Sequence, residues 1–208
     1  MLTELLLVMT LGWMDADPVA EARARFERLS SYRLTLRSLG PGDMQIMRYG
    51  YRKPGFVRMD LVSPFKGAVL IYSPLSRRVR LWPFGSPHRH PGFSLSPDNR
   101  LVRSAKGHRV DQSDVGTLLA NLQALQRQGE VGLLGETAIG EKSALHLIVD
   151  GKGRTTVGEV ARYEIWLDSD NLFPLKVVSF DRQGQEIETV LMENIELDPR
   201  LPDDFFTP

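Results

Sequence analysis

Apolar residues change from helical to alternating spacing early in the chain. Between Val19 and Leu29 they recur every three or four positions, and they follow Asp17-Pro18, a pair suited to cap and begin a helix. This pattern predicts a helix over about residues 18–30. From Ser31 onward the period is two, which is typical of a strand with one face in water.

Short alternating or wholly apolar segments make up most of the remaining chain, and turn signals such as Gly40-Pro-Gly-Asp43 separate them. Up to residue 82 the intervals leave no room for helices, so neighbouring strands are expected to run antiparallel. The strands expected after the first are 44–52, 56–62, 68–72, 77–82, 132–139, 143–149, 160–168, 175–181 and 185–195.

A second helix is predicted in the middle of the chain. Asp111 or Ser113 can cap it, and Val115 and the leucines that follow form one apolar stripe that ends before Gly129. Ahead of this helix, residues 83–97 hold four prolines and two glycines, which indicates a long loop.

Several strands, including the one around Trp166, carry apolar residues on both faces, which a solvated outer face does not require. Either helices cover the concave side, or a hydrophobic cavity lies between helices and sheet. A sheet of about ten or eleven strands must curl. The sequence therefore predicts an α+β fold, mainly β, with a strongly curved antiparallel sheet wrapped around helices, in one domain over residues 17–208.

The net charge is zero, but the charges are unevenly distributed. Residues 1–110 hold 18 of the 26 basic side chains and 8 of the 26 acidic ones, and the rest of the chain holds the opposite balance. This zero balance argues against binding of nucleic acid. The basic residues either pair across strands with the acidic half or form a basic rim for anionic head groups or an acidic partner.

Candidate catalytic and metal-binding residues are few. The chain has no cysteine, which excludes thiolate catalysis and zinc–thiolate sites. His88 and His90 have the spacing of metal ligands but lie in the Pro-rich loop without a third ligand, so exposed loop histidines are the simpler interpretation. His146 fits a half-buried strand position, and Glu186 and Glu188 fit the wet side of the last strand. We therefore expect no catalytic residue, no metal site and no cofactor.

Residues 1–16 contain an apolar stretch, Leu2–Trp13, that is too short to span a bilayer. Its length fits the core of a signal peptide, although Glu4 stands where such peptides are basic. The alternatives are a leader removed on export, an amphipathic first helix and a misassigned start.

Short motifs along the chain occur together in a known family. Tyr51–Asp60 places two basic residues before a proline and an aromatic strand after it, and Lys66–Pro74 adds a glycine turn and a strand that ends in Tyr-x-Pro. Tyr163–Asp168, Phe180–Gly184 and Leu201–Phe206 follow. In this order, over about residues 18–206, the motifs resemble the periplasmic outer-membrane lipoprotein carrier (LolA-like) superfamily.

The resemblance implies an incomplete β-barrel whose helices form a lid over a hydrophobic cavity for lipid acyl chains. Lys53, preceded by Arg52, matches the position of a basic residue that helps to hold the lid, although lysine lacks the planar fork of arginine. Arg52 and Lys53 are therefore expected at the cavity mouth. The residues expected to line the cavity are Leu34, Leu36, Met47, Tyr49, Met59, Leu61, Leu70, Tyr72, Trp166 and Val178. A shift by one position within a strand would exchange them for their neighbours.

The resemblance favours a monomeric periplasmic carrier that binds acyl chains or lipoproteins and passes them toward the outer membrane, with an envelope membrane or an acceptor protein as partner. The absence of cysteine argues against the membrane-anchored acceptor of the superfamily. One alternative is a lipid-sensing or regulatory interaction domain of the same fold in the cell envelope. Another is an enzyme that uses the cavity, which would need a polar cluster that the sequence does not display.

Overall fold

The computed structural model describes residues 17–41, 43–85, 91–104 and 106–207. Residues 1–16, His88 and His90 lie outside this part of the chain. Within it are two α-helices and eleven strands. The helices are α1 (Pro18–Phe26) and α2 (Val115–Gln126), and the strands are β1 (Ser31–Gly40), β2 (Asp43–Arg52), β3 (Phe56–Ser63), β4 (Val69–Ser73), β5 (Arg78–Trp82), β6 (Phe93–Leu95), β7 (Glu130–Ile139), β8 (Lys142–Asp150), β9 (Arg162–Asp168), β10 (Pro174–Phe180) and β11 (Glu186–Leu197).

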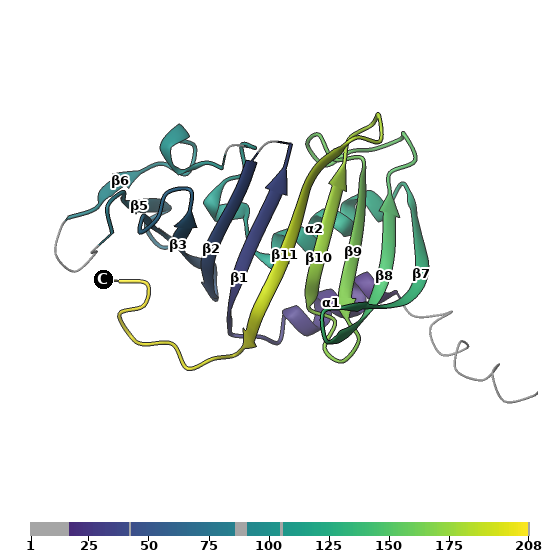
Figure 1. Cartoon of the computed structure of the whole chain (residues 1–208), viewed down its shortest axis with the longest axis horizontal. Helices are drawn as coiled ribbons and strands as arrows, with labels where there is room; N and C mark the ends of the chain where they lie inside the picture. The colour runs from purple at the N-terminus through teal and green to yellow at the C-terminus, as the bar shows by residue number, and fades with distance from the viewer. Residues whose placement is uncertain (1–16, 42, 86–90, 105, 208) are drawn as a thin grey trace, which may run out of the picture.

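All eleven described strands form one antiparallel sheet in the order β6-β5-β4-β3-β2-β1-β11-β10-β9-β8-β7 (Figure 1). The chain runs outward from β1 to β6, crosses through α2 to β7, and returns strand by strand to β11 beside β1. In the described part of the chain no ladder joins β6 to β7. The sheet is therefore strongly curled but open, and the predicted incomplete barrel is confirmed.

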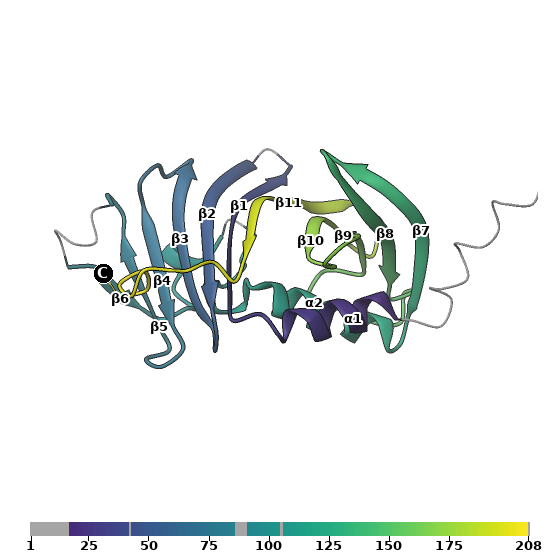
Figure 2. The same ribbon diagram turned by 90° about the horizontal axis from the view of Figure 1, so that it is seen from below.

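Both helices lie on the concave side of the sheet (Figure 2). The Asp17 carboxylate accepts hydrogen bonds from the backbone N–H groups of Val19 at 3.0 Å and Ala20 at 3.1 Å, as the predicted cap requires. The Arg23 guanidinium, on α1, donates to the Gly116 carbonyl of α2 at 2.6 Å, so the two helices are joined as one layer.

The main core lies between this helical layer and the sheet. Leu119, Leu122 and Leu125 of α2 are almost completely buried, and so are Leu147 of β8 and Ile165 of β9. A smaller apolar cluster lies on the other, convex face of β8–β10. These strands carry apolar residues on both faces because one face packs in the main core and the other in the convex cluster.

Two local expectations change. The predicted loop 83–97 contains a short edge strand, β6, which pairs with β5. The cap of α2 is Asp114, which accepts from the Thr117 N–H at 3.1 Å, whereas Asp111 pairs with Arg109 and the Ser113 hydroxyl donates to the Val110 carbonyl. Asp111, Ser113 and Asp114 all have side chains that can cap a helix, and the spacing of apolar residues does not identify which of them does so.

The two halves of the sheet meet at β1 and β11, where basic residues face acidic ones. Arg33 pairs with Glu196 and Arg37 with Glu193, each at 2.7 Å. At this junction the structure shows the pairing between the basic and acidic halves of the chain that the sequence suggested.

Candidate binding cavity

A cavity of about 270 Å³ lies between the concave face, α2 and the loop that precedes α2. The sheet contributes side chains from β1–β4 on one side and from β9–β11 on the other. Val115, Leu118 and Asn121 of α2 and loop residues 101–104 and 108–113 complete the wall. The helix and the loop together cover the concave face, as the lid of a half-barrel would.

Most of the lining is apolar, and six of the ten residues predicted to line the cavity do so. They come from four consecutive strands, since alternate residues of β1–β4 face inward. They are Leu36, Met47, Tyr49, Met59, Leu61 and Leu70. Leu34 and Tyr72 lie on the same concave face of the sheet as these six residues, but they do not line the cavity. Leu34 belongs to the main core, and Tyr72 packs against it.

Trp166 and Val178 lie on the opposite face of the sheet, and their predicted place in the cavity is wrong. Both belong to the convex apolar cluster, while Ile165 and Val177 beside them pack in the main core. The physical reason is that β9 and β10 are apolar on both faces and β10 carries an irregularity between Pro174 and Lys176, so alternation does not identify the inner face.

Arg52 and Lys53 do not line the cavity either. The Arg52 guanidinium lies over the rings of Phe56 and Phe206 on the convex face, at 5.1 and 4.8 Å from the ring centroids. The Lys53 ammonium donates to the carbonyl of Glu27, the residue that ends α1. Lys53 therefore contacts α1 through a backbone carbonyl at the helix C-terminus, where a cation is stabilised.

A polar cluster at one end of the cavity was not predicted. Glu188 of β11 is only 8% exposed and accepts hydrogen bonds from Ser38 of β1 and from two residues of the loop. Lys106 Nζ lies 3.1 Å from Glu188 Oε1, and His108 Nε2 lies 2.9 Å from Glu188 Oε2. Lys106 also donates to Ser38 Oγ at 3.1 Å. The cluster ties the loop to the β1–β11 junction.

Electrostatics keep this buried carboxylate ionised. Burial acts to raise the pKa of Glu188, but the hydrogen bonds from His108 and Ser38 and the charges of His108 and Lys106 outweigh burial and lower it to about 2. The hydrogen bond to Glu188 raises the pKa of His108 in turn. Glu188 was assigned to the wet side of its strand, which is wrong, because the loop that covers it is distant in sequence.

Buried tyrosines border the cavity near the start of α2. The Tyr49 hydroxyl lies 3.0 Å from Ser113 Oγ, and the Val115 N–H donates to the Tyr32 hydroxyl at 3.1 Å. Burial raises the pKa of both tyrosines, so they act here as neutral hydrogen-bonding groups. They fix the helix and loop against β1 and β2.

His146 does not belong to a second candidate binding or catalytic site. His146 of β8 is stacked on Trp166 on the convex face, with ring centroids 4.0 Å apart. Among the described residues there is no group of three or more His, Asp or Glu side chains that could hold a metal ion. The cavity offers apolar surface along the strands and polar side chains at the Glu188 cluster and along the loop before α2, an arrangement suited to non-covalent binding of an amphiphile.

No protein-family model matches the sequence, and none of the curated proteins matches it. Solved structures do match in fold. Lipoprotein LppX from Mycobacterium tuberculosis is 10% identical with a TM-score of 0.55, over 89% of this chain and 95% of LppX. MucB of Pseudomonas aeruginosa, in its complex with MucA, is 17% identical with a TM-score of 0.53, over 90% of this chain and 60% of that chain.

A LolA superfamily protein from Nitrosomonas europaea also matches, at 14% identity and a TM-score of 0.43, over 92% of this chain and 96% of that one. The fold is assigned from the first two structures and from the architecture itself. This chain has the LolA-like fold that its motifs suggested: an open, curled antiparallel sheet with helices over its concave face. Among the described residues no helix is long and apolar enough to cross a membrane.

Proposed function

We propose that the protein is a periplasmic carrier that holds a lipid acyl chain in the cavity between the sheet and α2. The single observation that carries this proposal is the cavity itself, which is apolar along four strands and covered by a helix and a loop. LppX, a lipoprotein, and MucB share the fold, which supports an envelope protein without fixing the cargo.

The volume of the cavity limits the cargo. The cavity volume of about 270 Å³ is just below the usual range of ligand pockets, about 300–1,000 Å³. This size favours one acyl chain, or part of one, over a bundle of several chains in the present conformation. We expect the lipid head group to lie near Glu188, at the polar part of the cavity. A head group buried against apolar residues would have no hydrogen-bond partner, and this would destabilise the complex.

A chain-length series tests the proposal directly. Each buried methylene contributes about 0.8 kcal/mol, or a factor of about four in affinity. We expect lysolipids of increasing chain length to displace a hydrophobic dye with affinities that rise by about this factor per methylene and then level off when the cavity is full. Affinities that do not depend on chain length, together with no lipid in a solvent extract of the natively purified protein, would contradict binding in the cavity.

Variants locate the binding site. Met59→Trp and Leu118→Trp place a larger side chain in the cavity from opposite walls, and we expect each to weaken dye binding at least tenfold. Leu134→Trp on β7 is the matched control, because Leu134 is 58% exposed and does not line the cavity. Equal effects of all three variants would show that the dye binds elsewhere.

A lipid-sensing or regulatory interaction domain is the second candidate. The observation that favours it is the likeness to MucB, which was solved in complex with MucA. The two candidates differ in the fate of the lipid: a carrier delivers bound lipid to acceptor vesicles, whereas a sensor retains it. Lipid that is retained by the protein in a vesicle-transfer assay would favour the sensor.

A further inference from the structure

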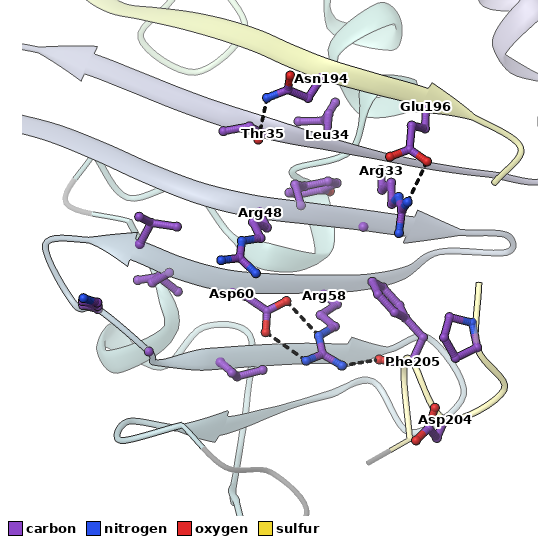
Figure 3. Close-up of a pocket in the computed structure, with 18 residues that line it drawn as sticks. Arg33, Leu34, Thr35, Arg48, Arg58, Asp60, Asn194, Glu196, Asp204 and Phe205 are labelled. Carbon is purple, nitrogen blue, oxygen red and sulfur yellow. Dashed lines mark hydrogen bonds and ion pairs between the residues drawn. The ribbon is translucent and has the colours of Figure 1, made fainter. Parts of the chain in front are cut away.

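A second hollow lies on the convex face, opposite the cavity. It is a groove of about 710 Å³ across β3, β2, β1 and the end of β11, and it adjoins the C-terminal segment, residues 198–207 (Figure 3). Arg33, Arg48 and Arg58 point from three neighbouring strands into this groove, and Val62 and Val69 contribute apolar surface.

The C-terminal segment shows what chemistry the neighbouring surface accepts. It carries the sequence Asp203-Asp-Phe-Phe206, two acidic residues followed by two aromatic ones. Phe206 is only 3% exposed and packs with Val69, Ile71 and Trp82 on the convex face. An acidic, aromatic segment is therefore already bound to this side of the sheet.

Arginines and a glycine hold the segment in place. Arg52 lies over the Phe206 ring, and Arg58 lies over the Phe205 ring at 4.9 Å from its centroid while donating to the Phe205 carbonyl at 2.9 Å. The Phe205 ring rests on Gly50, where an added Cβ would lie 2.5 Å from a ring atom. Guanidinium groups and exposed backbone thus form a surface that recognises aromatic rings.

The groove beside this segment has one more basic side chain than acidic ones. Its lining includes Arg33, Arg48, Arg58 and Lys66 and also Asp60, Glu196 and Asp204. Arg33 pairs with Glu196, and Arg58 makes a two-point ion pair with Asp60 at 2.9 Å. Arg48 lies between these pairs in Figure 3 and has no hydrogen-bond or ion-pair partner among the described residues. The ammonium group of Lys66, which also lines the groove, has none there either.

We propose that this groove binds an acidic, aromatic peptide segment of a partner protein, whose rings it holds in the way the adjoining surface holds the rings of Phe205 and Phe206. Arg48 and Lys66 pair with the carboxylates of the partner, and the apolar wall with the guanidinium planes receives its aromatic rings. The two hollows lie on opposite faces of the sheet, so this site does not depend on lipid binding in the cavity.

Fluorescence anisotropy with the full chain and labelled synthetic peptides tests the proposal. We expect saturable binding of a peptide with an Asp-Asp-Phe-Phe core, weakened at high salt because the ion pairs are exposed. Peptides in which Lys-Lys replaces the acidic pair, or Ala-Ala the aromatic pair, are expected to bind at least tenfold more weakly. Equal binding of all three peptides, or no binding at millimolar peptide, would overturn the proposal.

Charge-reversal variants place the peptide in the groove. Arg48→Glu and Lys66→Glu are expected to weaken binding about tenfold, and both positions are exposed, so the fold should be kept. Arg182→Glu makes the same change as Arg48→Glu at an exposed position in the β10–β11 turn and should leave binding unchanged. An equal loss with Arg182→Glu would mean non-specific attraction. Self-association that Arg48→Glu abolishes, without peptide binding, would mean that a second copy of the chain occupies the groove and would refute a partner protein.

Discussion

At the scale of single residues, Glu188 is the most unusual group in the structure. A buried carboxylate at the end of an apolar cavity is costly unless charges and hydrogen bonds compensate it. Here Ser38, Lys106 and His108 supply both, and two of them belong to the loop that covers the cavity. The same contacts that ionise Glu188 therefore hold the loop over the cavity.

The titration of Glu188 predicts how stability depends on pH. Its pKa is lowered from 4.5 to about 2, so its contribution is complete above about pH 4.5 and is lost as the pH falls toward 2. The loss amounts to about 3 kcal/mol of unfolding free energy. The pKa of His108 is raised, so its contribution is complete below its ordinary value of 6.5 and is lost as the pH rises through the folded value. Urea unfolding at a series of pH values measures the free energy of unfolding, and we expect it to decrease both at low pH, the acid limb due to Glu188, and at high pH, where His108 loses its proton.

Glu188→Gln tests the assignment of the acid limb. We expect this variant to lose most of the decrease in stability between pH 4.5 and 2 and to return the pKa of His108, followed by NMR, toward its ordinary value. Glu186→Gln is the control, because Glu186 is exposed and bonds only to Thr189 among the described residues. A pH profile that is the same for Glu188→Gln and the unchanged protein would show that other carboxylates cause the acid limb.

At the scale of elements, side-chain hydrogen bonds join α1 to three other parts of the fold, and one of them runs from the Arg25 guanidinium to the Asp170 carbonyl at 2.8 Å. α1 is joined to α2 through Arg23 and to the β2–β3 turn through Lys53, whose ammonium donates to the carbonyl of Glu27. Lysine has three donors and no planar fork, and it binds here to a helix C-terminus rather than to a carboxylate. The contact can therefore hold a helix end without fixing its angle.

Lys53→Met is expected to loosen α1 while leaving the sheet intact. The reason is that the Glu27 carbonyl loses its side-chain donor, and the contribution of such a cation to a helix end is about 0.3–1 kcal/mol. Hydrogen exchange should become about two- to fivefold faster in residues 18–27 and remain unchanged in β8–β10. Lys66→Met, which removes an exposed lysine in the next turn, should change neither region. Uniform acceleration across the chain would indicate global destabilisation instead.

At the scale of the whole molecule, the opposite charges of the two halves meet where the chain's last strand pairs with its first. Arg33–Glu196 and Arg37–Glu193 span β1 and β11, which are the first and the last of the described strands along the chain. Each pair is about half exposed and contributes about 0.2–1 kcal/mol. Their larger effect is on register, because a shift of β11 would move Glu193 and Glu196 away from the two arginines, and a shift by one residue would put them on the other face of the sheet.

Reversal of the charges at this junction tests the effect on the whole fold. Arg33→Glu combined with Arg37→Glu should lower the free energy of unfolding by about 1–2 kcal/mol. Adding Glu193→Arg and Glu196→Arg should restore most of it, and both effects should shrink in high salt. Urea denaturation of the double and quadruple variants provides the measurement. Failure of the second pair of changes to compensate would show that the arginines act through packing alone.

The sequence allowed prediction of both helices and of ten of the eleven described strands, all but β6. It also allowed the inner face of β1–β3 to be predicted, because polar and apolar residues largely alternate there. It did not allow the inner face of β9 and β10 to be predicted, since both faces are apolar and Trp166 and Val178 belong to a second cluster. The sequence also did not allow the Glu188 cluster to be predicted. Its members Ser38, Lys106 and Glu188 come from distant parts of the chain, and only the folded loop brings them together.

The absence of pairing between β6 and β7 in the described part of the chain affects how large a space the sheet can enclose. A closed barrel has a fixed circumference, because widening it would break a ladder of backbone hydrogen bonds. A sheet whose described outer strands are not paired can flatten or tighten by small changes of twist at every strand, with all its ladders kept. An open sheet of this kind can therefore enclose ligands of different sizes, and the cavity measures about 270 Å³ in this structure.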